Sequence, residues 1–450
     1  MNVDHTLASL RAARVAGDGK LLAAELQEHH PADLAASLAK AEPAEIHEYL
    51  RIIPWPARAE LFGYFEPELQ ASLIELTGRS ELAELFLHLS PDERVDVFNR
   101  LPPESAEALM PALAQAERED IRKLASYEEG TVGAVMTSDY ATLLPELTAR
   151  EAVEYLRAQA PNTETIYQAY VVDEQRRLIG TLSLRDLIVA PPNARVADLM
   201  FEEAIFVRAT DPMEAAAEAI SKYDLLAVPV VSGGEALVGI VTYDDAMDVA
   251  EAAATEDFQK AGGSSGFMGI GLKEATIGLL YRKRIVWLII LVFGNLFSSA
   301  GIAYFEETIA AHVALVFFLP LLIGSGGNAG SQSATLMVRA MATGDVTAAD
   351  WAWLLGREVL VAGLLGITMA VAVWGVGLLR GGPEIAAVVV CTMLLIVIVG
   401  SLIGMSLPFL LNQFGWDPAT ASAPLVTTIA DATGVLIYFG IATTLLPRLI

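Results

Sequence analysis

The hydrophobic and polar positions divide the chain into two parts at about residue 281. After this point, apolar runs of about 20 residues or more follow one another, which is the length that an α-helix needs to cross a bilayer. Before it, shorter amphipathic segments alternate with polar turns, as is typical of soluble domains. The sequence therefore predicts a soluble part followed by five membrane-spanning helices within residues 282–450, at residues 285–304, 310–342, 354–379, 385–411 and 421–446.

Proline recurs just before amphipathic segments in the first part of the chain, as in "HHPADLAASL" and "LSPDERVDVF". Proline is favoured at the first position of a helix. In "SPDE", Ser90 can cap the helix, and Glu93, three residues later, can complete a capping box. We expect residues 1–126 to form an all-α, superhelical array of short helices. The array contains no His, Cys or Ser constellation suited to catalysis, which favours a regulatory role.

A unit of the sequence repeats at an interval of 59 residues. Each copy predicts a β-branched strand, a turn, a second strand that contains glycine, and a helix opened by a hydroxyl side chain. The signatures "GTLSLRD" and "GIVTYDD" resemble those of tandem CBS domains, which implies an α/β pair over residues 127–248. The matching positions are Gly180 and Gly239, Ser183 and Thr242, and Asp186 and Asp245.

CBS pairs commonly bind adenine nucleotides, so this resemblance implies a nucleotide site. Its candidate residues are Arg185 and Asp186, and its candidate ligand is ATP. Where an aromatic side chain would stack on the base, the chain has Gln168 and Leu225, which argues against an adenine platform. The alternative is that the aspartates of the two copies only cap helices.

The acidic residues are concentrated in the soluble part. Residues 1–281 carry 47 Asp and Glu against 22 Lys and Arg, whereas residues 282–450 carry 8 against 7. This excess argues against nucleic acid as a partner and favours cations. The start of the chain lacks the pattern of a signal peptide, so we expect the soluble part in the cytoplasm. The single cysteine, Cys391, excludes an intramolecular disulfide.

An acidic helix with a linker is expected to connect the soluble and membrane parts, over residues 249–281. Where the predicted CBS pair runs into this helix, Asp245, Asp248 and Glu251 recur at intervals of three and share one helix face. Their like charges repel one another unless a cation lies among them. Cation-dependent packing is one interpretation, and a solvated acidic helix is the other.

The second span contains a polar stretch, "GSGGNAGSQSAT", at residues 324–335. Such a stretch is tolerated at membrane depth where it is buried in protein or lines a watery cavity. Its amide, hydroxyl and backbone carbonyl oxygens are hard ligands that suit Mg²⁺ or Ca²⁺. The competing interpretation is helix packing through the small residues Gly326 and Gly330. The candidate pathway residues are Gly324, Gly327, Asn328, Ser331, Gln332 and Thr335.

The last span contains a carboxylate, Asp431, with apolar or small residues on both sides. An unpaired charge at this depth costs roughly 3 kcal/mol or more unless it faces a cavity or a partner. No basic residue lies within two turns of it, so a contact with a cation is favoured over a structural role. Because Mg²⁺ gives up water reluctantly, we expect this carboxylate to hold a largely hydrated ion.

Basic residues next to the first span predict the orientation. Arg282, Lys283 and Arg284 flank it on the side of the soluble part, and an acidic loop follows it. By the positive-inside rule, the amino-terminal part is cytoplasmic and, after an odd number of spans, the carboxyl terminus is outside. We expect a multi-pass protein of the inner (plasma) membrane.

A helical amino-terminal domain, a CBS pair, an acidic helix and five spans that carry "GSGGNAGSQSAT" and "PLVTTIADATG" together resemble the MgtE family of magnesium channels. The resemblance covers nearly the whole chain. It implies a homodimer in the lipid bilayer, with a pore on the two-fold axis that the second and fifth spans line. Asp431 takes the place of the ion-selecting aspartate.

The resemblance also implies a magnesium sensor in the cytoplasmic part. Ions bound between acidic faces would hold the connecting helices closed, and their loss would let like charges separate the domains and open the pore. Ala253, Ser331 and Ala423 depart from the family pattern. The implied metal-binding acids are Asp92, Glu214, Asp224, Asp245, Asp248, Glu256, Asp257 and Asp417.

The sequence therefore predicts a channel for magnesium uptake that is selective for Mg²⁺ and closed by cytosolic Mg²⁺. One alternative is a transporter of Co²⁺ or Mn²⁺, or one coupled to another gradient, although Co²⁺ would be expected to have His or Cys ligands. A second alternative is a membrane-anchored nucleotide sensor that conducts nothing. An enzyme is not expected, because the chain has no phosphate loop and no nucleophile paired with a base.

Overall fold

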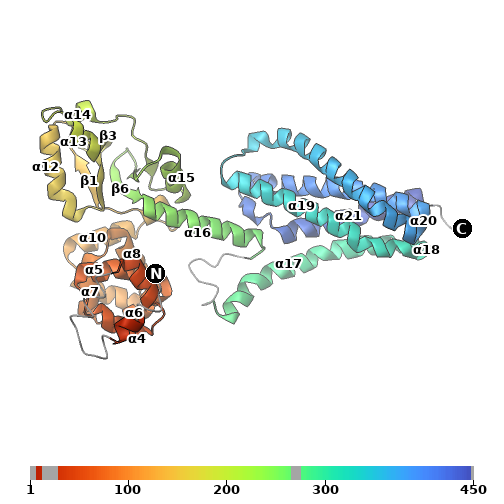
Figure 1. Ribbon diagram of the computed structural model, residues 1–450, viewed down its shortest axis with the longest axis horizontal. Helices are drawn as coiled ribbons and strands as arrows, with labels where there is room; N and C mark the ends of the chain where they lie inside the picture. The colour runs from red at the N-terminus through yellow and green to blue at the C-terminus, as the bar shows by residue number, and fades with distance from the viewer. Residues whose placement is uncertain (1–6, 13–28, 265–274, 447–450) are drawn as a thin grey trace. The chain divides into compact units, whose positions relative to one another are not determined.

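The computed structural model describes residues 7–12, 29–264 and 275–446 (Figure 1). The chain divides into two compact units, Met1–Glu251 and Ala252–Ile450. The first unit contains a helical domain followed by two α/β copies, and the second contains the long apolar helices. The order of these parts along the chain is the one that the sequence predicts.

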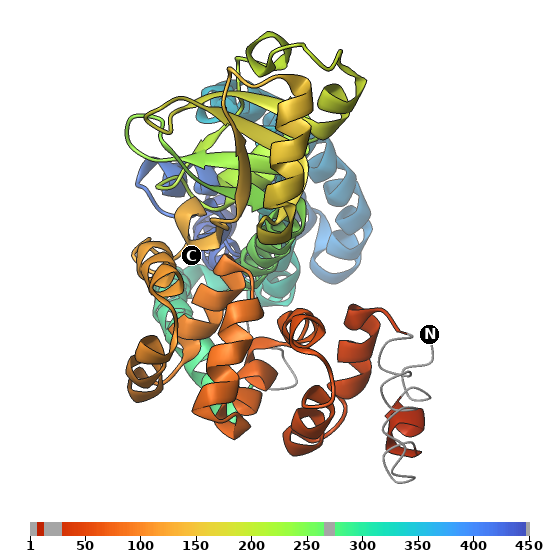
Figure 2. The ribbon, with the colours of Figure 1, turned by 90° about the vertical axis from the view of Figure 1, so that its left-hand side faces the viewer.

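The helical domain is an array in which each helix packs against the next but one (Figure 2). Its helices are α3 (Pro31–Leu38), α4 (Pro43–Leu50), α5 (Trp55–Gly63), α6 (Pro67–Leu76), α7 (Arg79–His88), α8 (Pro91–Arg100), α9 (Pro103–Leu109) and α10 (Gln115–Leu124). Ser90 and Glu93 form the predicted capping box of α8, in which the Ser90 N–H donates to Glu93 Oε2 at 3.3 Å. The apolar faces bury a core that includes Leu38, Ile46 and Phe86. The predicted superhelical array is confirmed.

The repeated unit forms two three-stranded sheets of the same topology. In each sheet the first strand is parallel to the middle strand, and the third is antiparallel to it. Gly180 pairs with Val171, and Gly239 pairs with Val230, so the 59-residue repeat is kept in the register. The strands are β1 (Tyr140–Leu143), β2 (Thr165–Val172), β3 (Leu178–Ser183), β4 (Val207–Arg208), β5 (Ala227–Val231) and β6 (Leu237–Thr242).

Both repeated glycines are required by a close backbone approach. A Cβ atom on Gly180 would lie 3.0 Å from the carbonyl oxygen of Phe201, and one on Gly239 would lie 2.8 Å from that of Thr137. The core of the second copy is continuous with the core of the helical domain, which makes the first unit one packed body. The accompanying helices are α11 (Val132–Val135), α12 (Ala149–Gln159), α13 (Leu184–Val189), α14 (Val196–Leu199), α15 (Glu214–Tyr223) and α16 (Tyr243–Ala261).

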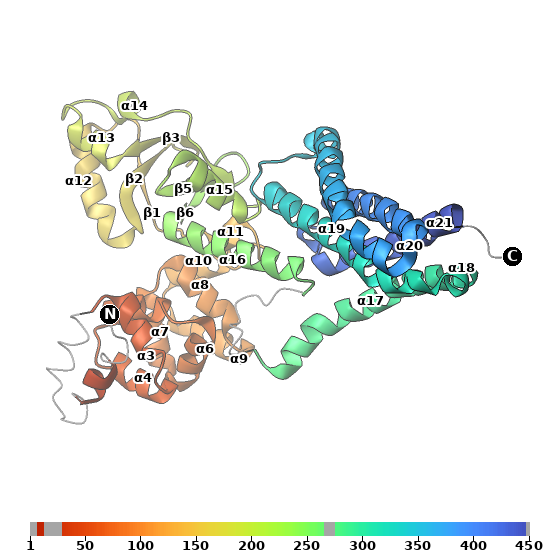
Figure 3. The ribbon, with the colours of Figure 1, turned by 45° about the vertical axis from the view of Figure 1, so that its right-hand side comes forward.

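In the part of the chain that the structure describes, four helices are long and apolar enough to cross a membrane (Figure 3). One of them, of 63 residues, breaks at Gly382, whose φ of 79° lies in the left-handed region that glycine tolerates. A Cβ atom on Gly377 would lie 2.9 Å from the Cα of Ala386, so the two halves fold back on each other. The four helices therefore make five passes. They are α17 (Ile277–Tyr304), α19 (Leu319–Ala342), α20 (Trp351–Gln413) and α21 (Ala423–Leu445), with the short α18 (Glu306–Ala311) after α17.

Neighbouring contacts fix the relative directions of these passes. α17 runs parallel to α21, because a Cβ atom on Gly294 would touch Thr428 and, further along both helices, Phe305 stacks on Phe439 with ring centroids 5.7 Å apart. The two helices are the first and the fifth passes. Their common direction is the one expected when successive passes alternate.

α19 runs antiparallel to α21. The hydroxyl of Tyr438, late in α21, donates to the carbonyl oxygen of Leu315, just before α19, at 2.9 Å. A Cβ atom on Gly327 would lie 3.2 Å from the side chain of Thr427, near the start of α21. This register puts Asp431 level with Gly324 to within about one helical turn.

Glycines allow α19 and the second half of α20 to approach closely. A Cβ atom on Gly330 would lie 2.7 Å from the carbonyl oxygen of Gly400, and one on Gly404 would clash with the carbonyl oxygen of Gly330. Gly326 is likewise buried against Ile396. The small residues Gly326 and Gly330 therefore serve helix packing, as one of the two sequence interpretations has it.

Candidate functional site

One face of α19 is polar although it is exposed within the membrane half. Gly324, Asn328, Gln332 and Thr335 are exposed, and their spacing of four, four and three residues puts them on one side of the helix. We call these four residues the polar face. The other side of α19 is buried against α20 and α21. Polar side chains at membrane depth require water or protein beside them, so the polar face fits a watery pathway or a subunit interface.

Asp431 lies at the level of Gly324, which is one end of the polar face. It is partly buried on α21. Among the residues that the structure describes, its carboxylate has no hydrogen-bond or ion-pair partner. A carboxylate in this position keeps its full capacity to accept hydrogen bonds from a hydrated cation.

Two predictions about the polar stretch are corrected. α19 is a continuous α-helix from Leu319 to Ala342, so the glycine carbonyl groups lie within its hydrogen-bonding pattern and are not freed by a break. Gly327 is buried against Thr427 on the packing side and does not belong to the polar face. Ser331 is partly buried, and its hydroxyl lies 3.5 Å from the carbonyl oxygen of Ala423. The side-chain oxygens of Asn328, Gln332 and Thr335 remain as candidate contacts.

At the other end of the polar face, Asp417 precedes a short 3₁₀ turn that leads into α21. Ala419 in this turn packs in one cluster with Val338, which belongs to the last turns of α19. The Lys260 ammonium donates to Asp417 Oδ2 at 2.6 Å and lies 2.7 Å from Glu256 Oε1. The structure thus brings together two predicted metal ligands, Glu256 and Asp417, with a lysine between them.

The first unit contains a second group of acids, Asp92, Glu93, Asp139, Glu164 and Asp245, which we call the acidic cluster. Asp92 and Glu93 open α8 in the helical domain, and Asp245 lies in the first turn of α16. Asp139 and Glu164 precede β1 and β2, and the Glu164 N–H donates to the carbonyl oxygen of Asp139 at 2.8 Å. The carboxyl charges act on one another between the helical domain and the two α/β copies.

The acidic cluster opposes its own ionisation. Burial and the charge of Asp92 raise the pKa of Asp245 to about 8. Burial, with the charges of Asp92 and Glu93, raises the pKa of Glu164 to about 7. Burial, with the charge of Asp120, raises the pKa of Asp139 to about 6. A cation bound here would favour the ionised carboxylates and would therefore oppose these shifts.

Asp139 and Glu164 were not predicted from the sequence. Each is an acid placed just before a predicted strand, in "TSDYATLL" and "NTETIYQAY". The parallel pairing of β1 with β2 places the starts of both strands at the same end of the sheet. That geometry is the signal that could have found them, because the CBS resemblance already implied the two strands.

The remaining predicted metal ligands are spread over the structure. Glu214 is the first residue of α15, and Asp224 caps the end of the same helix with a left-handed φ of 53°. On α16, burial and the charge of Glu251 raise the pKa of Asp248, and Asp257 lies further along the helix. Among the described residues, no three His, Cys, Asp or Glu side chains are grouped so that they could hold one metal ion. The predicted ligand sets are therefore not preassembled.

The candidate nucleotide residues lie at the start of α13. Ser183 Oγ donates to Asp186 Oδ2 at 2.5 Å, and the Asp186 N–H donates back to Ser183 Oγ at 3.1 Å. Thr242 and Asp245 repeat the first of these bonds at the same distance in the second copy. The aspartates thus take part in helix capping, whatever else they bind. Arg185 is exposed beside them.

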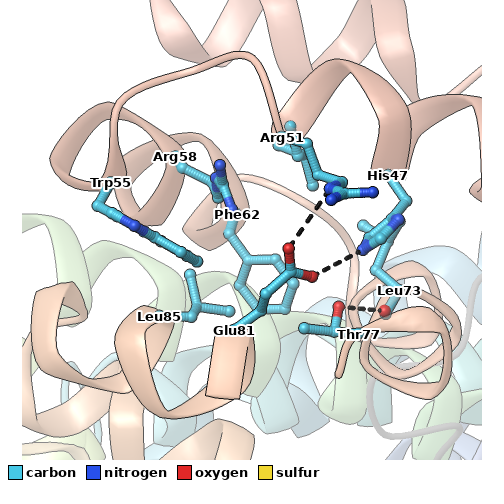
Figure 4. Close-up of a pocket in the computed structure, with 10 residues that line it drawn as sticks. His47, Arg51, Trp55, Arg58, Phe62, Leu73, Thr77, Glu81 and Leu85 are labelled. Carbon is cyan, nitrogen blue, oxygen red and sulfur yellow. Dashed lines mark hydrogen bonds and ion pairs between the residues drawn. The ribbon is translucent and has the colours of Figure 1, made fainter. Parts of the chain in front are cut away.

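A cavity of about 20 Å³ lies between α4, α5, α6 and α7 of the helical domain (Figure 4). Glu81 points into it, 3.4 Å from Arg51 Nε and 3.6 Å from His47 Nε2. Arg58 covers the ring of Trp55 at 3.8 Å, and its buried Nε has no partner among the described residues. The volume is enough for about one water molecule, which would satisfy this donor. We assign the cavity no ligand.

Three family models match the chain in the order of its parts. The MgtE intracellular N domain matches residues 29–130, and the CBS domain matches residues 132–193 and 196–252. The MgtE model, described as a divalent cation transporter, matches residues 319–441.

Known proteins resemble the chain over the same parts. The magnesium transporter MgtE of Thermus thermophilus is 39% identical over 441 residues, which cover 97% of this chain and 98% of that protein. The magnesium transporter MgtE of Bacillus subtilis is 31% identical over 95% of this chain and 94% of that protein. The crystal structure of the cytosolic domain of the Mg²⁺ channel MgtE in complex with ATP is 37% identical, with a TM-score of 0.52, and covers 54% of this chain and 99% of that one. The soluble part of a magnesium transporter is 29% identical, with a TM-score of 0.54, and covers 56% of this chain and 100% of that one. The chain therefore belongs to the MgtE family.

Proposed function

We propose that the protein is a Mg²⁺-selective channel for magnesium uptake, closed by cytosolic Mg²⁺. The observation that carries the proposal is the pairing of the polar face of α19 with the unpartnered carboxylate of Asp431. Both lie among apolar helices, where polar groups are costly unless they serve a pathway or a contact. We infer that the ion is Mg²⁺ because these relatives are named magnesium transporters.

The polar face favours a homodimer. In one chain it is exposed, and a second copy would cover it and place two Asp431 carboxylates around a common axis. Mg²⁺ keeps several waters in protein sites, so the amides of Asn328 and Gln332 would contact its hydration shell. Asp431 would supply the charge that favours a divalent ion. The basic residues in the first turns of α17 support the orientation with the soluble part in the cytoplasm and the carboxyl terminus outside.

The acidic residues of the soluble part support the sensor. Without a cation, the acidic cluster disfavours its own ionised form, and Mg²⁺ would relieve that repulsion. The proposed sensor acids are Asp92, Glu214, Asp224, Asp245, Asp248, Glu256, Asp257 and Asp417, and we add Asp139 and Glu164. Because these ligands are not grouped around one point, the proposal requires that Mg²⁺ draw them together when it binds.

The test is patch-clamp recording with Mg²⁺ as the only permeant cation. Mg²⁺ on the cytosolic side is raised stepwise from zero for the wild type, Asp431→Asn, and the matched control Asp345→Asn, an exposed aspartate after α19. We expect wild-type and control current that shuts off as internal Mg²⁺ rises, and no current from Asp431→Asn. Folded wild-type protein without current would exclude the channel, whereas current that ignores internal Mg²⁺ would keep the pore and exclude the gate.

ATP is a second candidate ligand, because a relative's cytosolic domain was crystallised with it. Arg185 and Asp186 are exposed and available, but Gln168 and Leu225 offer no ring to stack on adenine. We therefore propose ATP only as a weak modulator. Calorimetric titration of the wild type and Asp186→Asn with ATP tests whether ATP binds at this site. Binding heats that are equal for both proteins would exclude it.

A further inference from the structure

The Asp417 end of the polar face carries a positively charged side chain that the magnesium mechanism does not use. Lys260 is the only lysine or arginine among residues 223–272 of the sequence, a stretch rich in acids. Its ammonium donates to Asp417 Oδ2 at 2.6 Å and contacts Glu256 Oε1 at 2.7 Å. The three side chains are each about a third exposed, so water reaches the site without separating the charges.

Each of the two carboxylates is held in place in a different way. The other oxygen of Asp417, Oδ1, accepts the N–H of Ala419 at 2.8 Å, which fixes the carboxylate at the start of the 3₁₀ turn. Glu256 lies four residues before Lys260 on α16, so the pair shares one helix face. The end of this segment lies close to the membrane helices, because a Cβ atom on Gly263 would lie 2.8 Å from Trp287 and 3.3 Å from Pro424.

We propose that Lys260 is a tethered competitor of magnesium at the Asp417 end of the pathway. Its ammonium occupies the cation position between Glu256 and Asp417 when Mg²⁺ is absent, and Mg²⁺ displaces it on binding there. As a consequence, Lys260 sets the Mg²⁺ concentration needed for closure. This consequence, unlike the competition itself, rests on the proposed function.

The chemistry of the three groups supports competition. An ammonium group is a compact positive charge with three hydrogen-bond donors, so it can contact two carboxylate oxygens at once, as a small cation does. Mg²⁺ needs the same oxygens, directly or through its waters. With Lys260 in place, the site carries one net negative charge, so it still attracts Mg²⁺. Without Lys260 it would carry two, and Mg²⁺ would bind at a lower concentration.

The first experiment is zero-length crosslinking of the full-length protein with a carbodiimide. The reagent activates a carboxylate, the Lys260 amine attacks it, an amide bond forms, and the activating group leaves as a urea. Peptide mass spectrometry should find Lys260 joined to Asp417 without Mg²⁺. Millimolar Mg²⁺ should lower the yield several-fold, while NaCl at equal ionic strength should not. A yield that is constant over the whole Mg²⁺ range, or no crosslink without Mg²⁺, would overturn the proposal.

The second experiment measures closure in Lys260→Gln, with Lys222→Gln as the matched control that removes a lysine of the first unit. We expect the Mg²⁺ concentration for half-closure to fall about three- to five-fold in Lys260→Gln, which is the effect expected from losing a partly exposed ion pair. Lys260→Arg, which keeps the charge, and the control should stay near the wild type. An unchanged threshold in Lys260→Gln would overturn the proposal. If no variant conducts, the proposed function fails, but the crosslinking still decides whether Mg²⁺ and Lys260 compete.

Discussion

Asp431 and the acidic cluster meet opposite electrostatic conditions. Asp431 is a single carboxylate in an apolar helix, and no described residue shares its charge or its hydrogen bonds. The acidic cluster holds five carboxyls that raise one another's pKa in a partly wet part of the first unit. In the membrane half, the free-energy cost of an ionised carboxylate comes from the lack of water. In the first unit, it comes from the repulsion between neighbouring carboxylates.

This difference matches two tasks that one ion can serve. A lone carboxylate beside a polar face lowers the barrier for a hydrated cation but holds it loosely, which suits passage. Crowded carboxyls gain most from a cation that stays bound, and their repulsion returns when it leaves, which suits sensing. Lys260 stands between these two cases, because there the chain supplies its own cation.

Replacing Asn328 with leucine tests whether the lone carboxylate needs the polar face. We expect Asn328→Leu to lower the Mg²⁺ current about five- to ten-fold, because losing one hydrogen bond to the ion's water shell costs about 1–1.5 kcal/mol. Patch-clamp recording at zero internal Mg²⁺ measures the effect. Ser333→Ala, which removes a hydroxyl from the buried side of α19, should keep most of the current. Equal losses in both variants would show that α19 matters only for packing.

The crowding of the acidic cluster should appear as a pH dependence of stability. The pKa values of Asp139, Glu164 and Asp245 lie at about 6, 7 and 8 in the folded chain, above their ordinary values near 4. The folded state therefore holds protons that the unfolded state releases, and stability is lost as the pH rises from 5 to 8. The residue Glu164 as a whole is exposed, although its carboxyl group is partly desolvated by its neighbours, so solvent screens part of its effect.

Thermal unfolding of the soluble part, residues 1–264, measures this dependence. Relatives' soluble parts were crystallised separately, which supports the use of this fragment. Without Mg²⁺, we expect the melting temperature to fall by several degrees between pH 5 and pH 8. Millimolar Mg²⁺ should flatten the curve at constant ionic strength. If Mg²⁺ leaves the pH dependence of the melting temperature unchanged, the acidic cluster does not take part in magnesium sensing.

A single neutral substitution tests whether the repulsion between the carboxylates of the acidic cluster lowers stability. Asp245→Asn removes the carboxyl with the most raised pKa of the three and keeps an oxygen that can accept from Thr242. At pH 8 without Mg²⁺, we expect it to raise the melting temperature by about 2–4 °C and to reduce the stabilisation by Mg²⁺. Asp186→Asn is the matched control, since Asp186 accepts a hydrogen bond from a hydroxyl as Asp245 does but lies outside the acidic cluster. The same gain in both variants would contradict the crowding argument.

The features predicted well from the sequence are those that depend on residues close together in the chain. The capping box of α8, the repeat around Gly180 and Gly239, and the five apolar passes each follow from local pattern. The side of α19 on which Gly327 lies was not predicted. In a stretch made almost entirely of small and polar residues, the sequence does not distinguish the packing side from the exposed side.

The features that were missed depend on contacts between distant segments. Lys260 looks like an isolated base in an acidic helix, and its partner Asp417 is 157 residues away. Asp139 and Glu164 join Asp92 only through the packing of the helical domain on the CBS pair. The presence of carboxylates was readable from composition, whereas their grouping required the fold.

The smallest expected effect tests whether the geometry of α8, rather than charge alone, sets the crowding. Ser90→Ala removes one half of the capping box that positions Asp92 and Glu93, and such a loss costs about 1 kcal/mol. We expect the melting temperature of the soluble part to fall by about 2–4 °C at every pH. If α8 keeps its place, the pH slope and its response to Mg²⁺ stay as in the wild type, because no charge is lost. A flatter slope in Ser90→Ala would mean that the acidic cluster depends on the cap, and the contrast with Asp431 would then be one of backbone geometry as much as of charge.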